Sequence, residues 1–500
     1  MGSNAFGQPL LRREDTRLLT GQGRFTADLV PAVAAFAAFV RSPHAHADIL
    51  HVDFTAALAM PGVIAAYSGA DVAADGLGGI PAGAELIRLP GTPAGQGYAH
   101  RAARPLLALD RARFVGDGVA MVVAETEAAA RDAAELVAVE YSARPCVTDT
   151  RGAVAEGATL VWDAAPGNVC FRWDGGDAAA VAAAFARAHR VARLELVNNR
   201  VHVAAMETRG AVATFDTDTG RYTLSTGTQM PHGLRQDLAD AVLHVAPGEV
   251  RVLVADVGGS FGIKNALYPE QALLLSAARR TGRTVAWIGE RGDGFVSDYQ
   301  ARDNVSVGEL ALDAEGRFLA LRVSTVAAVG AYLAPKGQLS PTSNTPALAG
   351  VYRLPAIHVA VTGAYSHTAP TEVYRGAGRP EAVHLLERLV DHAAREMGID
   401  RLELRRRNLL VPAELPYQTG LGLRYDSGDF PAMLDAALAR ADWDGFPTRR
   451  EGSAARGRLR GIGLAHYCER VGGGWAEDAW LELRPDGGVT VLIGTMSNGQ

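Results

Sequence analysis

One stretch of the chain, residues 250–282, constrains the fold more than any other. It reads VRVLVADVGGSFGIKNALYPEQALLLSAARRTG. The apolar run at its start predicts a buried strand, and Pro269 is expected to open an apolar helix that Gly282 ends. Between them lie Gly258, Gly259 and Gly262. A glycine turn between a strand and a helix brings bare backbone N–H groups close to a bound group, commonly a phosphate or another anion. The alternative is a tight turn whose glycines only permit a positive φ.

Two nucleotide-binding patterns do not fit this turn. A GxGxxG fingerprint would need glycine at the positions of Phe261 and Lys264. A Walker loop needs Gly-Lys-Ser/Thr, whereas Lys264 lies between Ile263 and Asn265. The turn is therefore neither a dinucleotide fingerprint nor a P-loop.

A second glycine turn follows more than a hundred residues later. Tyr374–Gly378 reads YRGAG, and Pro380 then begins a predicted helix whose apolar stripe runs to Met397. Two helix N-termini could face one anionic group from two sides, which favours a cofactor site. Gln229, at the end of a predicted strand, has an amide that can donate and accept hydrogen bonds. It either recognises an oxo group or a substrate, or caps a helix.

Length and composition exclude several classes of protein. Five hundred residues predict about two to four domains, and the net charge of −6 shows no nucleic-acid or membrane footprint. Three dispersed cysteines (Cys146, Cys170 and Cys468) predict neither a disulfide framework nor an iron–sulfur cluster in this chain. No signal sequence and no run of about 18 apolar residues is visible. We expect a soluble protein of a reducing, cytoplasmic compartment.

Other polar features have plain structural explanations. His44 and His46 are expected to be loop or surface histidines rather than metal ligands, because no third ligand is near in the sequence. Glu207 and Arg209 are expected to form a structural salt bridge near a loop. Residues 449–460 are basic and poor in apolar residues, and they predict a linker. The chain stops just after a predicted hairpin, so we expect the sequence to be cut short of its natural end.

Four motifs, taken together, resemble those of a known family. They are VGGSFGIK (residues 257–264), STGTQMPH with Gln229, YRGAGRPEA (residues 374–382) and the final GTMSNGQ, which ends at Gln500. In this order they are similar to the large, molybdopterin-binding subunit of the xanthine dehydrogenase, aldehyde oxidase and carbon monoxide dehydrogenase family. The resemblance covers nearly all of the chain, and RFTADL and VGDGVAMVVAET fit the family's first domain.

The resemblance implies an α+β fold. An N-terminal α/β hammerhead-like domain would precede a mixed α+β domain that binds the molybdenum cofactor and the beginning of a second such domain. The expected division is an arm (1–25), the hammerhead-like domain (26–145), a linker (146–168), the first molybdopterin-binding domain (169–412), a connecting segment (413–460) and an incomplete second domain (461–500).

The resemblance also implies roles for particular residues. In the family, a molybdenum hydroxide is deprotonated by a glutamate and attacks an electron-poor carbon, with water as the source of oxygen. The residues expected to be catalytic are Gln229, which would bond the apical oxo group, and Arg375. The cofactor would be held by Gly258, Gly259, Phe261, Gly262, Arg375, Gly376 and Gln500, with no side-chain ligand to molybdenum. Asn265 and Ala377 would shape the substrate pocket. The catalytic glutamate is expected beyond Gln500.

Departures from the family pattern narrow the expected substrate. Gly376 replaces the cysteine that holds copper in carbon monoxide dehydrogenases, which argues against CO oxidation. Ala377 replaces an aromatic residue and Asn265 an acidic one of the purine-oxidising members, which argues against xanthine. An aldehyde or an N-heteroaromatic carbon is left as the expected site of hydroxylation.

The resemblance implies partners as well. A small iron–sulfur subunit and a medium FAD-binding subunit would carry electrons away, in a dimer of heterotrimers, and the cofactor would be the cytosine dinucleotide form. One alternative is a catalytically inactive or truncated paralogue that retains the cofactor-binding fold. A nucleotide-binding protein that uses the glycine turns is the other, and the two failed patterns weigh against it.

Overall fold

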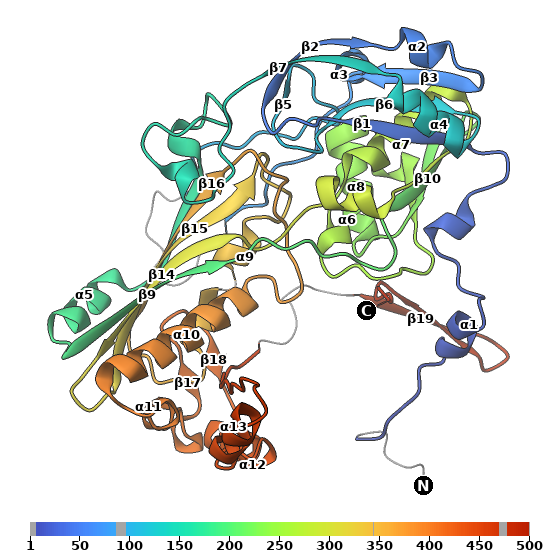
Figure 1. Ribbon diagram of the computed structural model, residues 1–500. Helices are drawn as coiled ribbons and strands as arrows, with labels where there is room; N and C mark the ends of the chain where they lie inside the picture. The colour runs from blue at the N-terminus through green and yellow to red at the C-terminus, as the bar shows by residue number, and fades with distance from the viewer. Residues whose placement is uncertain (1–6, 87–96, 344, 470–477, 500) are drawn as a thin grey trace.

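A computed structural model describes residues 7–86, 97–343, 345–469 and 478–499 of the chain. Two large β-sheets, each with its own hydrophobic core, carry the architecture (Figure 1). Helices cover both sheets, and the expected α+β class is confirmed. Within the described residues, no helix has the length and apolar character that crossing a membrane requires.

The first sheet has seven strands in the order β12-β11-β10-β13-β1-β6-β3. Its strands are β1 (Ala35–Arg41), β3 (Val63–Ser68), β6 (Gly118–Ala124), β10 (Gly210–Asp216), β11 (Arg221–Thr226), β12 (Val250–Leu253) and β13 (Val285–Ile288). β1 runs antiparallel to β6 and parallel to β13, where Ala35 lies opposite Val285. Strands from both sides of the predicted linker thus share one sheet, and the predicted domain limits stay a prediction.

Helices pack on this sheet because their apolar faces match its core. They are α3 (Gly69–Ala74), α4 (Glu127–Glu135), α6 (Pro231–Asp237) and α7 (Pro269–Thr281), and the short α8 (Arg291–Ser297) follows β13 along the chain. The side chain of Thr126 caps α4, accepting the N–H of Ala129 at 3.1 Å. Pro269 begins α7, and Gly282, with φ 65°, ends it as the sequence predicts.

A small three-stranded sheet lies beside the first one. Its order is β5-β2-β7, and α2 (Thr55–Leu58) follows its middle strand along the chain. The strands are β2 (Ala47–Asp53), β5 (Arg111–Ala112) and β7 (Ala138–Ala143). His46 lies in the loop before β2, which agrees with the prediction of a loop or surface histidine. Its side chain is buried because its ring stacks on that of His367, with 4.1 Å between the ring centroids.

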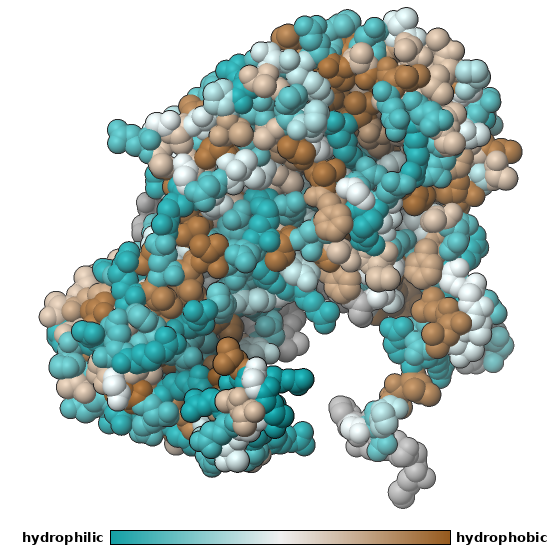
Figure 2. All heavy atoms as spheres, in the orientation of Figure 1, coloured by the Kyte–Doolittle hydropathy of each residue, from teal (hydrophilic) through white to brown (hydrophobic). Residues whose placement is uncertain are grey.

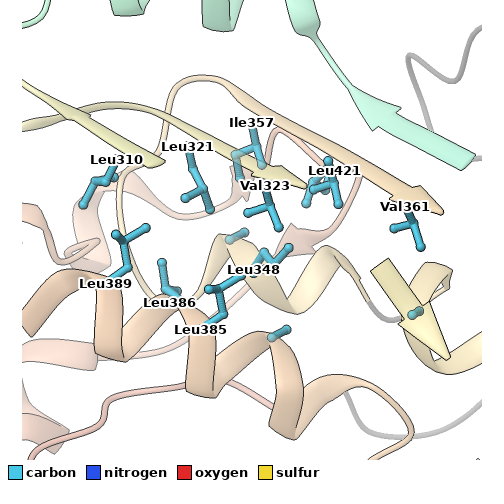
Figure 3. Close-up of a cluster of buried hydrophobic side chains, with 14 of the residues drawn as sticks. Leu310, Leu321, Val323, Leu348, Ile357, Val361, Leu385, Leu386, Leu389 and Leu421 are labelled. Atoms are coloured by element: carbon cyan, nitrogen blue, oxygen red, sulfur yellow. The ribbon is translucent and has the colours of Figure 1, made fainter. Parts of the chain in front are cut away.

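The second large sheet has six strands in the order β4-β8-β16-β15-β14-β9. They are β4 (Gly97–Tyr98), β8 (Val169–Gly176), β9 (Arg190–Asn198), β14 (Asn304–Leu312), β15 (Phe318–Gly330) and β16 (Ile357–Tyr365). One face packs on α10 (Arg379–Met397), whose leucines meet those of the strands (Figure 3). The stripe predicted for this helix therefore faces the core, and α5 (Ala178–Ala186) packs on β15 and β16.

Smaller elements complete the chain. They are α1 (Asp15–Leu19), α9 (Leu339–Thr342), α11 (Arg401–Asn408), α12 (Phe430–Arg440), α13 (Phe446–Ala454), β17 (Tyr417–Gln418), β18 (Arg424–Tyr425), β19 (Ala479–Leu483) and β20 (Val489–Ile493). Short 3-10 segments are η1 (Thr26–Leu29), η2 (Gly152–Val154), η3 (Pro166–Asn168), η5 (Pro247–Glu249), η6 (Ile263–Asn265), η7 (Thr345–Ala349) and η8 (Pro412–Glu414), and η4 (Leu238–Leu243) is a π segment. The linker predicted at residues 449–460 is partly wrong, because α13 covers its first half.

The predicted C-terminal hairpin is present as β19 and β20, which pair only with each other within the described part of the chain. Its large apolar side chains are exposed, Leu483 to 80%. A wide gap separates this hairpin and α1 from the lobe that holds α12 and α13 (Figures 1 and 2).

Candidate cofactor site

The first glycine turn follows β12 closely and has an unusual backbone. Three of its residues have a positive φ: Gly259 (99°), Phe261 (55°) and Gly262 (111°). Glycine adopts this region at little cost, whereas a side chain such as that of Phe261 seldom does. The turn is therefore held in shape by its surroundings.

Glu207 is the main group that holds the turn. Its backbone N–H donates to the carbonyl of Gly258 at 3.0 Å, and its Oε2 accepts the N–H of Gly258 at 2.8 Å. The same carboxylate accepts Nζ of Lys264 at 2.7 Å and the N–H of Thr26 at 3.1 Å. A Cβ at position 258 would lie 2.4 Å from Cβ of Glu207, so only glycine permits this approach.

The ion pairs near Glu207 differ from the predicted one. Glu207 and Arg209 do not pair with each other: Glu207 pairs with Lys264, and Arg209 pairs with Glu270 at 2.8 Å and Asp298 at 2.5 Å. Burial alone would raise the pKa of Glu207, but the Lys264 ammonium and the hydrogen bonds outweigh it and hold the pKa below its usual value. Both pairs are structural, as expected, and one of them supports the turn.

Gln229 is bonded to the first turn through its amide oxygen. Its Oε1 accepts the N–H of Gly262 at 2.8 Å, and its backbone N–H donates to the carbonyl of Lys264 at 2.9 Å. Because the oxygen is already used, the donors on Nε2 face away from the turn, and Nε2 has no protein partner among the described residues. Gln229 caps no helix, since α6 begins at Pro231 without a side-chain cap.

The second glycine turn lies directly against the first. The N–H of Arg375 donates to the carbonyl of Phe261 at 2.9 Å, and a Cβ at Gly262 would lie 2.2 Å from the carbonyl oxygen of Val373. Gly376, Ala377 and Gly378 all have positive φ values of 90°, 45° and 102°. The structure thus brings together the two turns that the sequence separates by more than a hundred residues.

Arg375 adds a charge to this junction. Its side chain is exposed, and its guanidinium lies 6.0 Å from the centre of the Phe261 ring. It has no carboxylate partner in the part of the chain that the structure describes. An exposed cation without a carboxylate partner among the described residues suits an anionic ligand.

Only one of the two predicted helix N-termini adjoins the turns. The second turn leads straight into α10, whereas η6 and the extended Ala266 separate the first turn from α7. The first residues of α7 are buried, and the N–H of Tyr268 donates to Oε1 of Gln271 at 3.0 Å. The expectation of two helix N-termini facing one ligand is therefore wrong for α7, whose end is covered by protein groups.

The C-terminal stretch reaches the same place. The N–H of Gly259 donates to the carbonyl of Asn498 at 3.2 Å, and a Cβ at Gly499 would lie 1.8 Å from the carbonyl oxygen of Val257. The third predicted contact thus lies against the first turn. Gln500 itself is outside the described residues.

Two residues that sequence reasoning missed lie beside Asn265. Nζ of Lys336 donates to Oδ1 of Asn265 at 2.9 Å, and the backbone N–H of Lys336 donates to Oε2 of Glu372 at 2.9 Å. Burial raises the pKa of Glu372 to about 7. One sequence signal was available for Lys336, because the chain has only two lysines and the other, Lys264, belongs to the first turn.

A cavity of about 520 Å³ lies next to the second turn. Arg379, the first residue of α10, joins the two: Nη1 donates to the carbonyl of Gly376 at 3.4 Å, and Nε lies 3.1 Å from Oε1 of Glu469. Apolar and polar side chains both line the cavity. They include Ser343, Leu423, Arg424, Tyr425, Phe430 and Cys468.

Comparison with known families agrees with this geometry. Residues 161–409 match the model of the molybdopterin cofactor-binding domain, and residues 20–145 match that of the aldehyde oxidase and xanthine dehydrogenase a/b hammerhead domain. The chain belongs to the xanthine dehydrogenase and aldehyde oxidase family. Both glycine turns and Gln229 fall within the first match.

Curated relatives within the xanthine dehydrogenase and aldehyde oxidase family span most of the chain. The carbon monoxide dehydrogenase large chain of Hydrogenophaga pseudoflava is 32% identical over 98% of this chain and 62% of its own length. The nicotine 6-hydroxylase large subunit of Paenarthrobacter nicotinovorans is 32% identical over 99% of this chain and 61% of its own. The chain thus spans about three fifths of the length of these relatives.

Solved structures of similar proteins have the same fold. Quinoline 2-oxidoreductase from Pseudomonas putida 86 superposes with a TM-score of 0.87 and 32% identity, covering 100% of this chain and 63% of that one. Carbon monoxide dehydrogenase from Oligotropha carboxidovorans gives a TM-score of 0.87 and 29% identity over 99% of this chain and 63% of that one.

Proposed function

We propose that this chain is the molybdopterin-binding subunit of a molybdenum hydroxylase, which adds oxygen from water to an aldehyde or N-heteroaromatic carbon. The observation that carries the proposal is the amide of Gln229. Its oxygen is fixed by Gly262, so it can only donate outward. A donor aimed beside two glycine turns suits an oxo group on a metal.

The residues of the site fit an anionic pterin cofactor. The junction of the turns offers the charge of Arg375, which has no carboxylate partner among the described residues and lies beside the Phe261 ring. The carboxylate of Glu207, which contacts the first turn, is already neutralised by Lys264 and by backbone donors. When bound, the cofactor supplies the oxidising centre that takes up the electrons released by the substrate.

The chain's own residues would bind the cofactor and orient its oxo group. Gln229 would donate to the oxo group, the backbone around Gly258–Gly262 and Gly376 would lie against the pterin, and Arg375 would balance its charge. Gln229 and the two glycine turns are fixed by other protein groups, so little reorganisation is needed there when the ligand binds.

The cavity beside the second turn has room for a ring-shaped substrate, although Gln229, Asn265 and Ala377 are not among the residues that line it. Its volume of about 520 Å³ lies within the usual range for small-molecule sites, and Tyr425 and Phe430 give it aromatic walls. A small aliphatic aldehyde would leave most of it empty. Two of the compared proteins are named for N-heteroaromatic compounds, nicotine and quinoline, which supports the same choice. Gly376 and Ala377, at the positions discussed above, weigh against CO and xanthine.

The proposal extends to partners. Both curated relatives are large chains or subunits of their enzymes, and the three cysteines of this chain are dispersed. We therefore place electron transfer on separate iron–sulfur and FAD subunits in a cytoplasmic dimer of heterotrimers, with the cytosine dinucleotide form of the cofactor.

The test is Gln229→Glu in the purified complex. A carboxylate keeps an acceptor for the N–H of Gly262 but removes the outward donor. We expect turnover to fall by about 100-fold, while the wild-type complex holds molybdenum at close to one atom per chain, measured by elemental analysis. The exposed Gln8→Glu in the N-terminal arm is the matched control. A folded wild-type complex without molybdenum, or equal rates in both variants, would refute the proposal.

A further inference from the structure

Both lysines of the chain lie at the first turn. Lys264 is buried and bonded to Glu207, as described above. Lys336, in the loop between β15 and α9, is half-buried, and its Nζ donates to Oδ1 of Asn265 at 2.9 Å. The contact between Lys336 and Asn265 fixes the orientation of the Asn265 side chain, which is predicted to face the substrate.

The Lys336 contact determines which end of the Asn265 amide faces outward. An ammonium group has donors only, so the Asn265 atom beside it must be the carbonyl oxygen. The Nδ2 donors then lie at the other end of the planar amide. Nδ2 of Asn265 has no hydrogen-bond partner among the described residues, and it is accessible to solvent. The site therefore offers a donor at this point, where an unrestrained asparagine could offer either a donor or an acceptor.

Lys336 is itself fixed in place. Its backbone N–H donates to Oε2 of Glu372 at 2.9 Å, and Oε1 of Glu372 accepts the N–H of Val373 at 2.8 Å. The carboxylates of Glu372 and Asp237 both attract its ammonium. Glu372 lies two residues before the second turn and Asp237 ends α6, so Lys336 is bonded by one of these segments and attracted by the other.

We propose that Lys336 is a positioning residue that fixes the Asn265 amide with its donor toward the substrate, and that Asn265 thereby selects a substrate with an acceptor atom. A pyridine-type ring nitrogen or a carbonyl oxygen satisfies this donor. A ring that presents an N–H, or no polar atom, leaves the donor unpaired at a cost in affinity. The proposal rests on the function proposed above, since it assigns the substrate side of the same site.

Two probes of the same shape test this selectivity by binding alone. Isoquinoline and naphthalene both have two fused six-membered rings, and only isoquinoline has an acceptor nitrogen. Equilibrium dialysis with the cofactor-loaded complex, above the pKa of the ring nitrogen, gives the ratio of their affinities. We expect the wild type to prefer isoquinoline by about tenfold.

Three variants separate positioning from general structural damage. Asn265→Leu should bring the ratio close to one, Lys336→Met should lower it severalfold by freeing the amide, and Lys336→Arg, which retains a donor, should restore it. A ratio unchanged in Asn265→Leu or in Lys336→Met, or a wild-type ratio near one, would overturn the proposal. Molybdenum content measured on the same samples tests the proposed function separately, because probe binding requires no turnover.

Discussion

Glu207 bonds to both the backbone N–H and the carbonyl of Gly258, and its carboxylate also compensates a buried ammonium. The Lys264 side chain is 2% exposed and lies 2.7 Å from Oε2 of Glu207. Burial lowers the pKa of Lys264, because its charged form is poorly solvated there, and the carboxylate opposes this effect. At the scale of single residues, the shape of the turn thus depends on one charge pair.

We expect Glu207→Gln to destabilise the protein by about 3 kcal/mol, because it leaves Lys264 as a buried cation without its counter-charge. The free energy of unfolding in denaturant measures this. Adding Lys264→Met should recover more than half of the loss, since it removes the stranded charge. The matched control is Glu403→Gln, in an exposed pair with Arg407, which should change the free energy by less than about 0.5 kcal/mol. Equal losses in both glutamate variants would contradict this account.

At the scale of elements, the two turns form one unit because glycine lets them touch. Gly262 has a φ of 111°, and a Cβ there would lie 2.2 Å from the carbonyl oxygen of Val373. A side chain at this position would strain the backbone and push the second turn away from the first.

Gly262→Ala should therefore remove most of the pterin from the purified protein and lower the free energy of unfolding by at least about 2 kcal/mol. Pterin released by denaturation and read by fluorescence measures the first effect. Gly248→Ala is the control, because that glycine has nothing within 4 Å of its Cβ position. Full pterin content in Gly262→Ala would show that the turns need not touch to hold the ligand.

The sequence predicted where helices begin and end better than it predicted which distant segments contact one another. Helix ends at Thr126, Gly282 and Gly398 follow local rules, since a cap or a left-handed residue needs only its neighbours. The contact of Arg375 with Phe261 joins distant segments, and only the resemblance to a known family suggested that they meet. Lys336 was missed because no local pattern links it to Asn265.

Two further features could not be foreseen because local composition does not show which distant segments pack against a residue. The segment at residues 449–460 is poor in apolar side chains, and this composition favoured a linker. It nevertheless continues α13, which ends at Ala454. His46 lies in a loop, within the prediction of a loop or surface histidine, but its burial against His367, which follows β16 more than three hundred residues later, had no local signal.

At the scale of the whole molecule, His46 and His367 join two regions of the chain. Nδ1 of His46 lies 2.6 Å from the carbonyl oxygen of Pro145, and the N–H of Val147 donates to Nδ1 of His367 at 3.0 Å. The pair thus ties the loop before β2 and the end of β16 to residues 145–147. Burial, and next the neighbouring His46, lower the pKa of His367 to about 4.

Acid should loosen this junction. The folded pKa of His367 lies below the unfolded value of about 6.5, so the unfolded state binds the proton more tightly. The stability contributed by neutral His367 is fully present above about pH 6.5 and falls by about 3 kcal/mol as the pH drops to about 4. His367→Gln should flatten this part of the stability curve relative to the wild type, whereas the exposed His232→Gln should not. Parallel curves for the wild type and His367→Gln would contradict this assignment.

The pairing of β1 with β13 has a consequence for how the chain is made. Ala35 leaves the ribosome long before Val285, yet the two lie opposite each other in the sheet. The early strands therefore wait with an open edge while some 250 further residues are synthesised. Pairings of such long range are slow to form and leave apolar surface exposed in the interval. A nascent chain of this kind depends on chaperones until β13 arrives, and a nick between the two strands would leave fragments that cannot each complete the sheet.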